Sequence, residues 1–376
     1  MAAKKSAKKP GAKPAEVLFA AAAIERLEGK ASLPVKFQKM LDALPLKRVC
    51  EGGIVALKVH VGGWMGFTTI PPLFIRLLVQ KLREAGAKGL YIMDGSWSIG
   101  EAVARGYTAE VLGAPLVGAA GIKDKYCYRH KVGYKTLKEV EVCGNIEDAD
   151  ALINLSHFKG HGACAYGAAC KNLAMGCVTS KTRGALHHLE GGLTYREDLC
   201  VKCKKCVEAC NHHAASWSAK ENRLEIFFHH CVYCQHCVLA CPKEAIKVSG
   251  GGFVPFQRGL ALATREVLKT FAPGRALHIN FATQVTAYCD CWGFSSPALI
   301  PDVGIFASED IVAIDKATLD ATKDGQPLPG SLPPGRKLVE GKHLFERIHG
   351  KDPYIQIKEM EALGLGTSAY ALREIK

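Results

Sequence analysis

The chain has 376 residues, of which 48% are hydrophobic and 23% are charged. This length predicts two or three domains, and this composition is typical of globular proteins, so it excludes a disordered chain or a membrane bundle. No run of about 18 apolar residues occurs, so we expect no membrane span. The apolar run at 17–24 is short and leads into Glu25 and Arg26, which is untypical of a secretory signal. We therefore expect a cytoplasmic protein.

Of the net charge of +13, five units lie in the N-terminal segment, and the remaining +8 is unremarkable for the body of the chain. Five lysines lie in the first 15 residues, and no acidic residue precedes Glu16. Residues 1–16 are therefore expected to form a disordered basic tail. Such a tail could contact an acidic partner or nucleic acid, but a solvated tail is the simpler interpretation. Because no clustered basic and aromatic pattern follows, nucleic-acid binding is only a weak alternative.

From residue 50 onward, short apolar runs alternate with helical patterns. The expected strands are 54–61, 90–93 and 151–155, and the expected helices are 71–85, 99–105 and 108–112. This alternation predicts an α/β fold with a mainly parallel sheet. Ligands of such sheets bind beyond the carboxyl ends of the strands. The loops after Val61, Met93 and Leu155 are therefore the expected sites of function.

The loop after Leu155 carries several functional side chains. It contains His157, Lys159 and His161, and the expected helix after it carries Lys171 and Asn172. We expect the lysines to hold an anionic group and the histidines to shuttle protons or bind a metal. His157, Lys159, His161 and Lys171 are therefore the candidate catalytic residues, and Asn172 is a candidate cofactor-binding residue. Glycines at 160, 162 and 167 would allow close approach by a ligand. The loop is neither a Walker loop nor a GxGxxG motif, so no motif names a nucleotide as the ligand.

Eight of the sixteen cysteines form two runs with the same spacing: Cys200, Cys203, Cys206 and Cys210, then Cys231, Cys234, Cys237 and Cys241. This spacing is typical of bacterial ferredoxins with two [4Fe–4S] clusters, in which the fourth cysteine of each run binds the other cluster. We therefore expect Cys241 to join the first three cysteines of the first run, and Cys210 to join those of the second. Disulfides fit poorly in a chain without a secretion signal, and zinc sites are usually spaced differently.

Short strands at 224–228 and 245–248 suit a ferredoxin module over 196–250. The fourth cysteine is followed by Pro242 in the second run but by Asn211 in the first, so the two clusters are expected to differ in exposure and potential. The histidine pairs at 187–188, 212–213 and 229–230 are interpreted mainly as surface residues.

The α/β pattern resumes after a glycine hinge at 250–252. Helices are expected at 256–271 and 309–322, and strands at 277–285 and 303–307. We therefore predict one discontinuous α/β domain, over 50–195 and 253–325, with the ferredoxin module inserted. Residues 326–376 are expected to form a linker and a small helical C-terminal piece.

Two further cysteines, Cys289 and Cys291, flank Asp290. In a regular strand their sulfurs would point to opposite faces, so only a turn could aim both at one ion. Isolated cysteines are more often small buried hydrophobic residues. A third metal site here remains a hypothesis, since thiolates select zinc, copper(I) or iron–sulfur species.

Three blocks occur in this order: residues 155–162 with 171–176, the twin cysteine runs, and residues 289–292 followed by 301–308 and 312–315. Together they resemble the domain-of-unknown-function 362 family of uncharacterised iron–sulfur centre proteins. The resemblance covers roughly residues 50–325. It implies an α/β domain with a two-cluster ferredoxin insert, mostly in anaerobic or facultative prokaryotes, and no established reaction. It also suggests that Cys289, Cys291 and the loop at 157–171 share one pocket with Asp302 and Asp315.

We predict an iron–sulfur oxidoreductase in which two [4Fe–4S] clusters deliver electrons to a substrate or a further cofactor, such as a flavin or a metal. Asp290 and Asp302 would orient that ligand or hold a metal, and a ferredoxin or a reductase would be the electron partner. The alternatives are a non-catalytic electron carrier or assembly partner, and a redox or metal sensor. A dedicated carrier would not need so large an α/β domain, which favours the enzyme.

Overall fold

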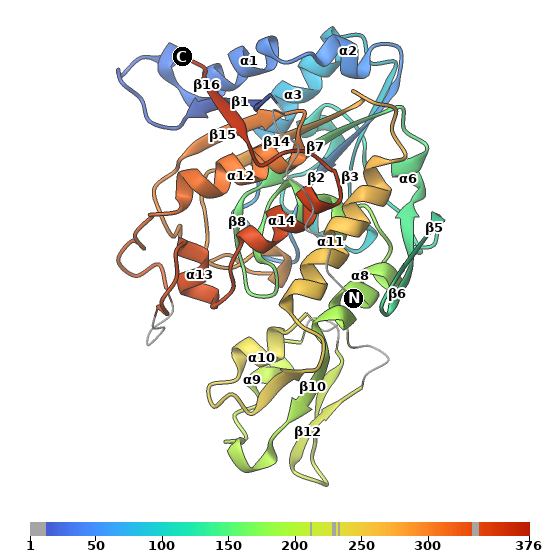
Figure 1. Ribbon diagram of the computed structural model, residues 1–376, viewed down its shortest axis with the longest axis vertical. Coiled ribbons are helices and arrows are strands. Elements are labelled where there is room, and N and C mark those ends of the chain that lie inside the picture. The colour runs from blue at the N-terminus through green and yellow to red at the C-terminus, as the bar shows by residue number, and fades with distance from the viewer. Residues whose placement is uncertain (1–12, 211–212, 228–230, 232–233, 333–337) are drawn as a thin grey trace, which may run out of the picture.

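The computed structural model describes residues 13–210, 213–227, 231, 234–332 and 338–376. A large α/β body carries a smaller lobe at one end (Figure 1). The body contains one eight-stranded sheet, in the order β16-β1-β15-β14-β7-β2-β3-β4. Its strands are β1 (Ala15–Ala21), β2 (Ile54–Val59), β3 (Gly89–Asp94), β4 (Leu116–Gly118), β7 (Ala151–His157), β14 (Ala276–Ala282), β15 (Gly304–Ser308) and β16 (Tyr370–Glu374).

The predicted α/β fold with a mainly parallel sheet is confirmed. Strand β15 is antiparallel to both of its neighbours, β1 and β14. The other pairings between neighbouring strands of this sheet are parallel.

Helices cover both faces of the sheet, which explains why its central strands are apolar throughout. In β2, Val55 and Leu57 belong to one buried cluster, whereas Ala56 belongs to the other. The first cluster includes side chains of α1 (Leu33–Ala43), α2 (Leu46–Cys50), α3 (Pro72–Glu84) and α5 (Ala109–Leu112). The second includes side chains of α7 (Ala169–Gly176), α11 (Phe253–Leu268), α12 (Ile311–Thr322), α13 (Leu344–His349) and α14 (Tyr354–Ala362).

Shorter helices and hairpins lie along the chain between the strands of the sheet and the helices that cover it. They are α4 (Ile99–Ala104), α6 (Gly144–Glu147), α8 (Ser180–His187) and the hairpins β5 (Cys127–Tyr134) with β6 (Leu137–Cys143) and β8 (Lys159–His161) with β9 (Ala165–Gly167). No helix within the described ranges is long and apolar enough to cross a membrane.

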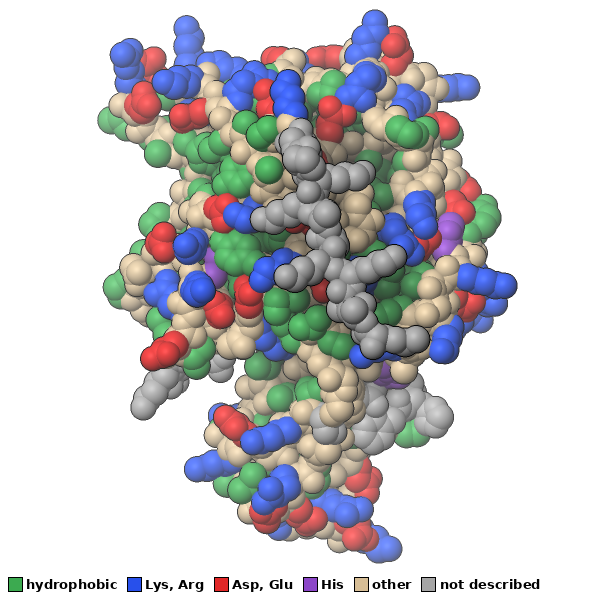
Figure 2. Space-filling model, viewed as in Figure 1, with side chains coloured by type: hydrophobic (Ala, Val, Ile, Leu, Met, Phe, Trp, Pro, Cys, Tyr) green, Lys and Arg blue, Asp and Glu red, His purple; other side chains and the backbone are tan. Residues whose placement is uncertain are grey.

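The small lobe spans residues 192–249, between α8 and α11 along the chain. Strand β10 (Gly192–Tyr195) pairs with β13 (Ile246–Ser249), and β11 (Ala215–Ser218) pairs with β12 (Arg223–Ile226). Two short helices, α9 (Lys205–Glu208) and α10 (His236–Ala240), lie beside them. Charged side chains of both signs are spread over the face of the lobe that Figure 2 shows.

The sheet extends beyond the boundaries that the sequence suggested. Ala15 and Glu16, which were assigned to the tail, lie in β1, and the C-terminal piece ends in β16 as well as containing helices. Strand β1 pairs with both β15 and β16. Because these partners are remote in sequence, a short run such as β1 gives little local signal. Asn211, His212, His229 and His230 lie outside the described residues.

Candidate functional site

The carboxyl ends of β2, β3 and β7 and the loop after β14 border a cavity of about 770 Å³. Ligands of open α/β sheets bind at this edge. All four candidate catalytic residues line the cavity, together with Cys289 and Cys291. The segments that the sequence singled out separately therefore meet here.

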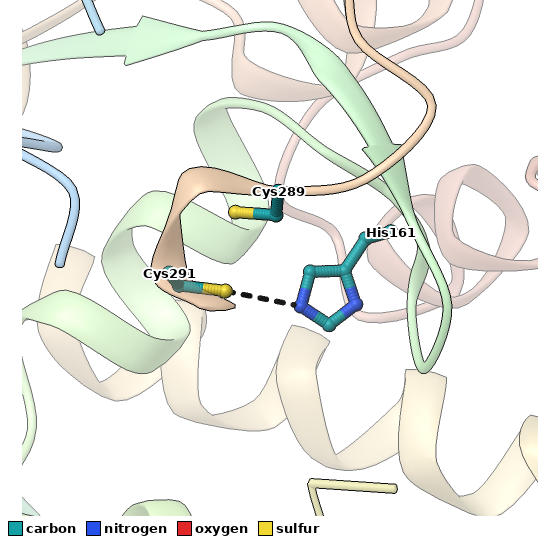
Figure 3. A group of neighbouring side chains, drawn as sticks. All are labelled: His161, Cys289 and Cys291. Atoms are coloured by element: carbon teal, nitrogen blue, oxygen red, sulfur yellow. Dashed lines mark hydrogen bonds between the residues drawn. The ribbon is translucent and has the colours of Figure 1, made fainter. Parts of the chain in front are cut away.

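The two sulfurs are brought together by a turn. Cys289 and Cys291 lie in the loop after β14, where Asp290–Trp292 form a 3-10 turn. Their sulfurs and a ring nitrogen of His161 all lie within 4.8 Å of one another (Figure 3), and such a group could hold a metal ion. The Lys171 Nζ lies 3.8 Å from the Cys289 Sγ and 3.9 Å from the Cys291 Sγ. The arrangement thus joins two thiols, an imidazole and an ammonium group.

The hydrogen bonds of His161 define where its proton lies. Its Nδ1 accepts the backbone N–H groups of Ala163 and Cys164, each at 3.1 Å. A neutral ring must then carry its hydrogen on Nε2, which lies 3.5 Å from the Cys291 Sγ. Burial and the nearby Lys171 ammonium lower the pKa of His161 well below its usual value. His161 is therefore a neutral donor that points at a sulfur.

The two thiols differ in acidity. Burial disfavours ionisation, but hydrogen bonding from Cys291 and the charge of Lys171 hold the pKa of Cys289 well below its usual value. The hydrogen bond to Cys289, together with burial, raises the pKa of Cys291 well above its usual value. The pair is therefore a thiolate at Cys289 and a thiol at Cys291.

A second histidine faces the pair, and the sequence analysis did not identify it. The His60 Nε2 lies 3.7 Å from the Cys289 Sγ, and its Nδ1 lies 3.5 Å from the Asp94 Oδ2. Asp94 also pairs with the buried Lys58, at 2.9 Å. Burial raises the pKa of Asp94, but Lys58 and His60 outweigh burial and hold it well below its usual value. Two features of the sequence could have pointed to this network: Lys58 lies inside an apolar strand, and Asp94 directly follows the apolar run of another.

His157 and Lys159 belong to a different network, centred on Asp290. Lys159 pairs with the Asp290 carboxylate, and the His157 Nδ1 lies 3.3 Å from the same oxygen. The His157 Nε2 lies 2.8 Å from the carbonyl oxygen of Thr283, to which it donates. Burial and Lys159 lower the pKa of His157. This network is buried and holds the turn between the two sulfurs, so both residues already have protein partners.

Asn172 also has its hydrogen-bonding capacity engaged within the protein. Its Oδ1 accepts from the Lys58 Nζ at 2.6 Å, and its Nδ2 donates to the Asn154 Oδ1 and the Leu155 carbonyl oxygen. It lines the cavity, but its amide holds Lys58 against the end of β7.

The two other acidic residues do not join the cavity as expected. Asp302 is exposed and accepts the backbone N–H of Gln284 at 2.6 Å, and it is not among the described residues that line the cavity. Asp315 is buried and accepts the N–H groups of Ala169 and Cys170, each at 3.0 Å. Burial raises the pKa of Asp315 to about 6, against the effect of these hydrogen bonds. Asp315 therefore anchors the start of α7.

Two of the three glycines in the loop after Leu155 pack against protein. A Cβ on Gly160 would lie 2.3 Å from the carbonyl oxygen of Ala287, and a Cβ on Gly162 would lie 2.4 Å from Leu239 Cδ1. The expectation that these positions admit a ligand is wrong for both. The loop after β14 packs against Gly160, and helix α10 packs against Gly162.

In the lobe, the eight cysteines line two separate hollows. Cys200, Cys203, Cys206 and Cys241 line one, and Cys210, Cys231, Cys234 and Cys237 line the other. Backbone N–H groups point at some of these sulfurs: Ala214 and Ala215 at Cys210, and Ala245 at Cys241, at 3.2 to 3.3 Å. All sixteen cysteines lie within the described residues and are free of disulfides.

The second hollow adjoins the large cavity. Cys234 and His236 line both spaces, and His213 lines the cavity as well. The ring of His236 lies 4.1 Å, centroid to centroid, from that of Trp292, in the turn after Cys291. The lobe and the sulfur pair therefore meet at the cavity wall. His187, expected at the surface, also lines the cavity.

Comparisons with known proteins place the chain in a family. A search among curated proteins found no match. Among solved structures, a protein from Thermotoga maritima is similar at a TM-score of 0.37 and 13% identity, over 68% of this chain and 52% of that one. The lactate racemase apoprotein from Thermoanaerobacterium thermosaccharolyticum is similar at a TM-score of 0.31 and 11% identity, over 61% and 48%. The chain thus aligns with only about half the length of each. Residues 55–320 match the family model described as Domain of unknown function (DUF362), and the chain therefore belongs to that family.

Proposed function

We propose that this chain is an iron–sulfur oxidoreductase. In the proposal, Cys200, Cys203, Cys206 and Cys241 bind one [4Fe–4S] cluster, and Cys231, Cys234, Cys237 and Cys210 bind a second. Electrons then pass to a substrate or a further cofactor in the large cavity. The observation that supports this most directly is that Cys234 lines both a four-cysteine hollow and that cavity.

The residues around the hollows suit clusters of this kind. Each hollow offers four thiols, the donor set of a [4Fe–4S] cluster, and much of the remaining lining is apolar, including Leu193, Ile226 and Ile246. The N–H groups directed at Cys210 and Cys241 are of the type that tunes cluster potentials. When bound, such clusters supply single electrons at low potential.

The cavity supplies what a reduction needs besides electrons. Its volume of about 770 Å³ lies within the range of small-molecule and cofactor sites, roughly 300–1,000 Å³. The nearby Cys289 and Cys291 raise the pKa of Lys171 against the effect of burial, so its ammonium group stays charged and can orient an anionic substrate. The neutral His161 can donate its Nε2–H as a hydrogen bond to the negative charge that develops on a substrate during reduction, while solvent would supply the proton.

The test begins with anaerobic purification and measurement of iron and sulfide. We expect about eight of each per chain, about half of both in Cys234→Ser, and an unchanged content in Cys127→Ser, which removes a partly exposed cysteine outside the lobe. Zinc in place of iron, or colourless protein, would overturn the proposal.

A second measurement separates the enzyme from the non-catalytic carrier. In the enzyme, His161→Ala and Lys171→Met should leave reduction of the clusters by dithionite unchanged but abolish turnover once a substrate is found by screening small anions. If both variants retain full turnover, these two residues have no catalytic role. If the chain turns over no substrate and its cavity holds no organic molecule or metal, the carrier is favoured.

A further inference from the structure

The environment of Cys289 and Cys291 allows two uses of the sulfur pair: ligation of a metal ion, or dithiol redox chemistry. The sulfurs alone do not decide, since thiolates serve both. The groups that surround the two sulfurs distinguish metal ligation from redox chemistry.

The protonation of His161 disfavours metal ligation. A histidine that binds a metal through Nε2 normally donates its Nδ1–H to a second residue. Here the Nδ1 faces two N–H donors, from Ala163 and Cys164, so a hydrogen on it would be repelled by both. The Nε2 therefore keeps the hydrogen and has no lone pair for a metal.

A cation already lies against the sulfurs. The Lys171 Nζ is nearly equidistant from the two, at 3.8 and 3.9 Å, and its ammonium group neutralises a thiolate there without any metal ion. On the Cys289 side, the His60 Nε2 lies 3.7 Å from the Sγ, and the Nδ1 of the same ring lies 3.5 Å from the Asp94 Oδ2. A thiolate with a neighbouring thiol, a cation and two imidazoles is the environment of a reactive cysteine.

We propose that Cys289 and Cys291 form a redox-active dithiol–disulfide pair that collects two electrons at the cavity wall. This inference rests on the proposed function, because the clusters are its electron source. The Cys289–Cys291 disulfide would accept one electron from each of the two reduced clusters and one proton, its S–S bond would break, and a thiolate at Cys289 and a thiol at Cys291 would form. The His161 Nε2–H faces the Cys291 Sγ at 3.5 Å, so it is placed to hydrogen-bond that sulfur as the bond breaks, and the proton would come from solvent by way of the Lys171 ammonium group, 3.9 Å from the same sulfur.

The pair would solve a mismatch in electron number. Each cluster carries one electron, whereas most reductions of organic molecules require two. The contact between His236 and Trp292, in the turn after Cys291, brings the lobe to the pair. A dithiol between the lobe and the cavity would combine two single electrons into one two-electron step.

The test is a reductive titration of the anaerobically purified chain after mild oxidation with diamide. Wild-type protein should take up about four electrons, one per cluster and two for the disulfide. Cys289→Ser and Cys291→Ser should each take up about two while retaining about eight irons, and Cys127→Ser should behave as wild type. Alkylation followed by mass spectrometry should find the two cysteines linked after oxidation and both alkylated after reduction.

The outcomes separate the two proposals. If the wild-type chain contains no iron after anaerobic purification, the proposed function itself is contradicted. Eight irons with an uptake of only two electrons in the wild type overturns the dithiol pair alone. One additional metal ion per chain that is absent from Cys289→Ser and shields both sulfurs from alkylation also overturns it, in favour of metal ligation.

Discussion

The lobe and the cavity both place sulfur beside sulfur, but they do so in opposite ways. The lobe draws all eight cysteines from 42 consecutive residues, at 200–241. The cavity gathers Lys58, His60, Asp94, His161 and Cys289 from strands and loops that are remote in sequence. The lobe therefore depends on spacing, whereas the cavity depends on the packing of the whole sheet.

The same contrast extends to what stabilises each region. Among the described residues of the lobe, the buried apolar cluster has five members, Cys206, Ala215, Leu224, Cys237 and Ile246, and two of these are cysteines of the twin runs. So small a core rarely suffices without disulfides or metal. The body has two large buried clusters, one on each face of its sheet.

The largest expected effect is therefore that of removing iron. If clusters bind as proposed, chelation under oxidising conditions should unfold the lobe and leave the sheet intact, because metal binding to such modules is coupled to folding. Hydrogen exchange followed by mass spectrometry measures this directly. Residues 192–249 should lose protection while β2, β7 and β14 keep theirs. Uniform protection across both regions would show that the lobe has a stable core of its own.

The converse experiment targets the body through the buried pair of Lys58 and Asp94, whose charged atoms lie 2.9 Å apart. Lys58→Met should lower the free energy of unfolding of the body by about 3–5 kcal/mol, because it leaves a buried carboxylate without its partner. Urea denaturation followed by hydrogen exchange measures the loss, and the lobe should keep its iron.

A matched control is Lys47→Met, which breaks the exposed pair of Lys47 with Glu51 and should cost less than about 1 kcal/mol. The double variant Lys58→Met with Asp94→Leu should recover much of the stability, since it removes both buried charges. Equal losses in Lys58→Met and Lys47→Met would mean that the buried pair has little role in holding this edge of the sheet.

The sequence predicted the two regions unequally, for the same physical reason. Strands such as β2, β3 and β7 were predicted because their apolar runs are local. The grouping of the eight cysteines into two sets of four was predicted from local spacing in the same way. His60 was missed because only the tertiary fold brings it within 3.7 Å of Cys289. Asp302 was expected in the cavity from the family resemblance, but its carboxylate is exposed and accepts the Gln284 N–H instead. Long-range packing decides such positions, and a single sequence does not display it.

The smallest expected effect concerns acid stability of the body, away from both sulfur sites. His343 is fully buried, its Nδ1 accepts the Phe345 N–H at the start of α13, and its Nε2 lies 3.0 Å from the Leu319 carbonyl oxygen. Burial lowers the pKa of His343 from 6.5 to about 4. Between these values the unfolded chain binds a proton that the folded chain does not, so stability is lost as the pH falls from 6.5 toward 4.

The loss amounts to about 3 kcal/mol at pH 4, at about 1.36 kcal/mol for each unit of pKa. Asn is also a good residue for the start of a helix and carries no titrating group, so His343→Asn should remove this part of the pH dependence. Urea denaturation of both chains at pH 4 and 6.5 measures the difference. Acid also releases iron from clusters, but that loss is common to both chains and cancels in the comparison. An identical pH dependence in the two chains would show that His343 is protonated in the folded body without cost.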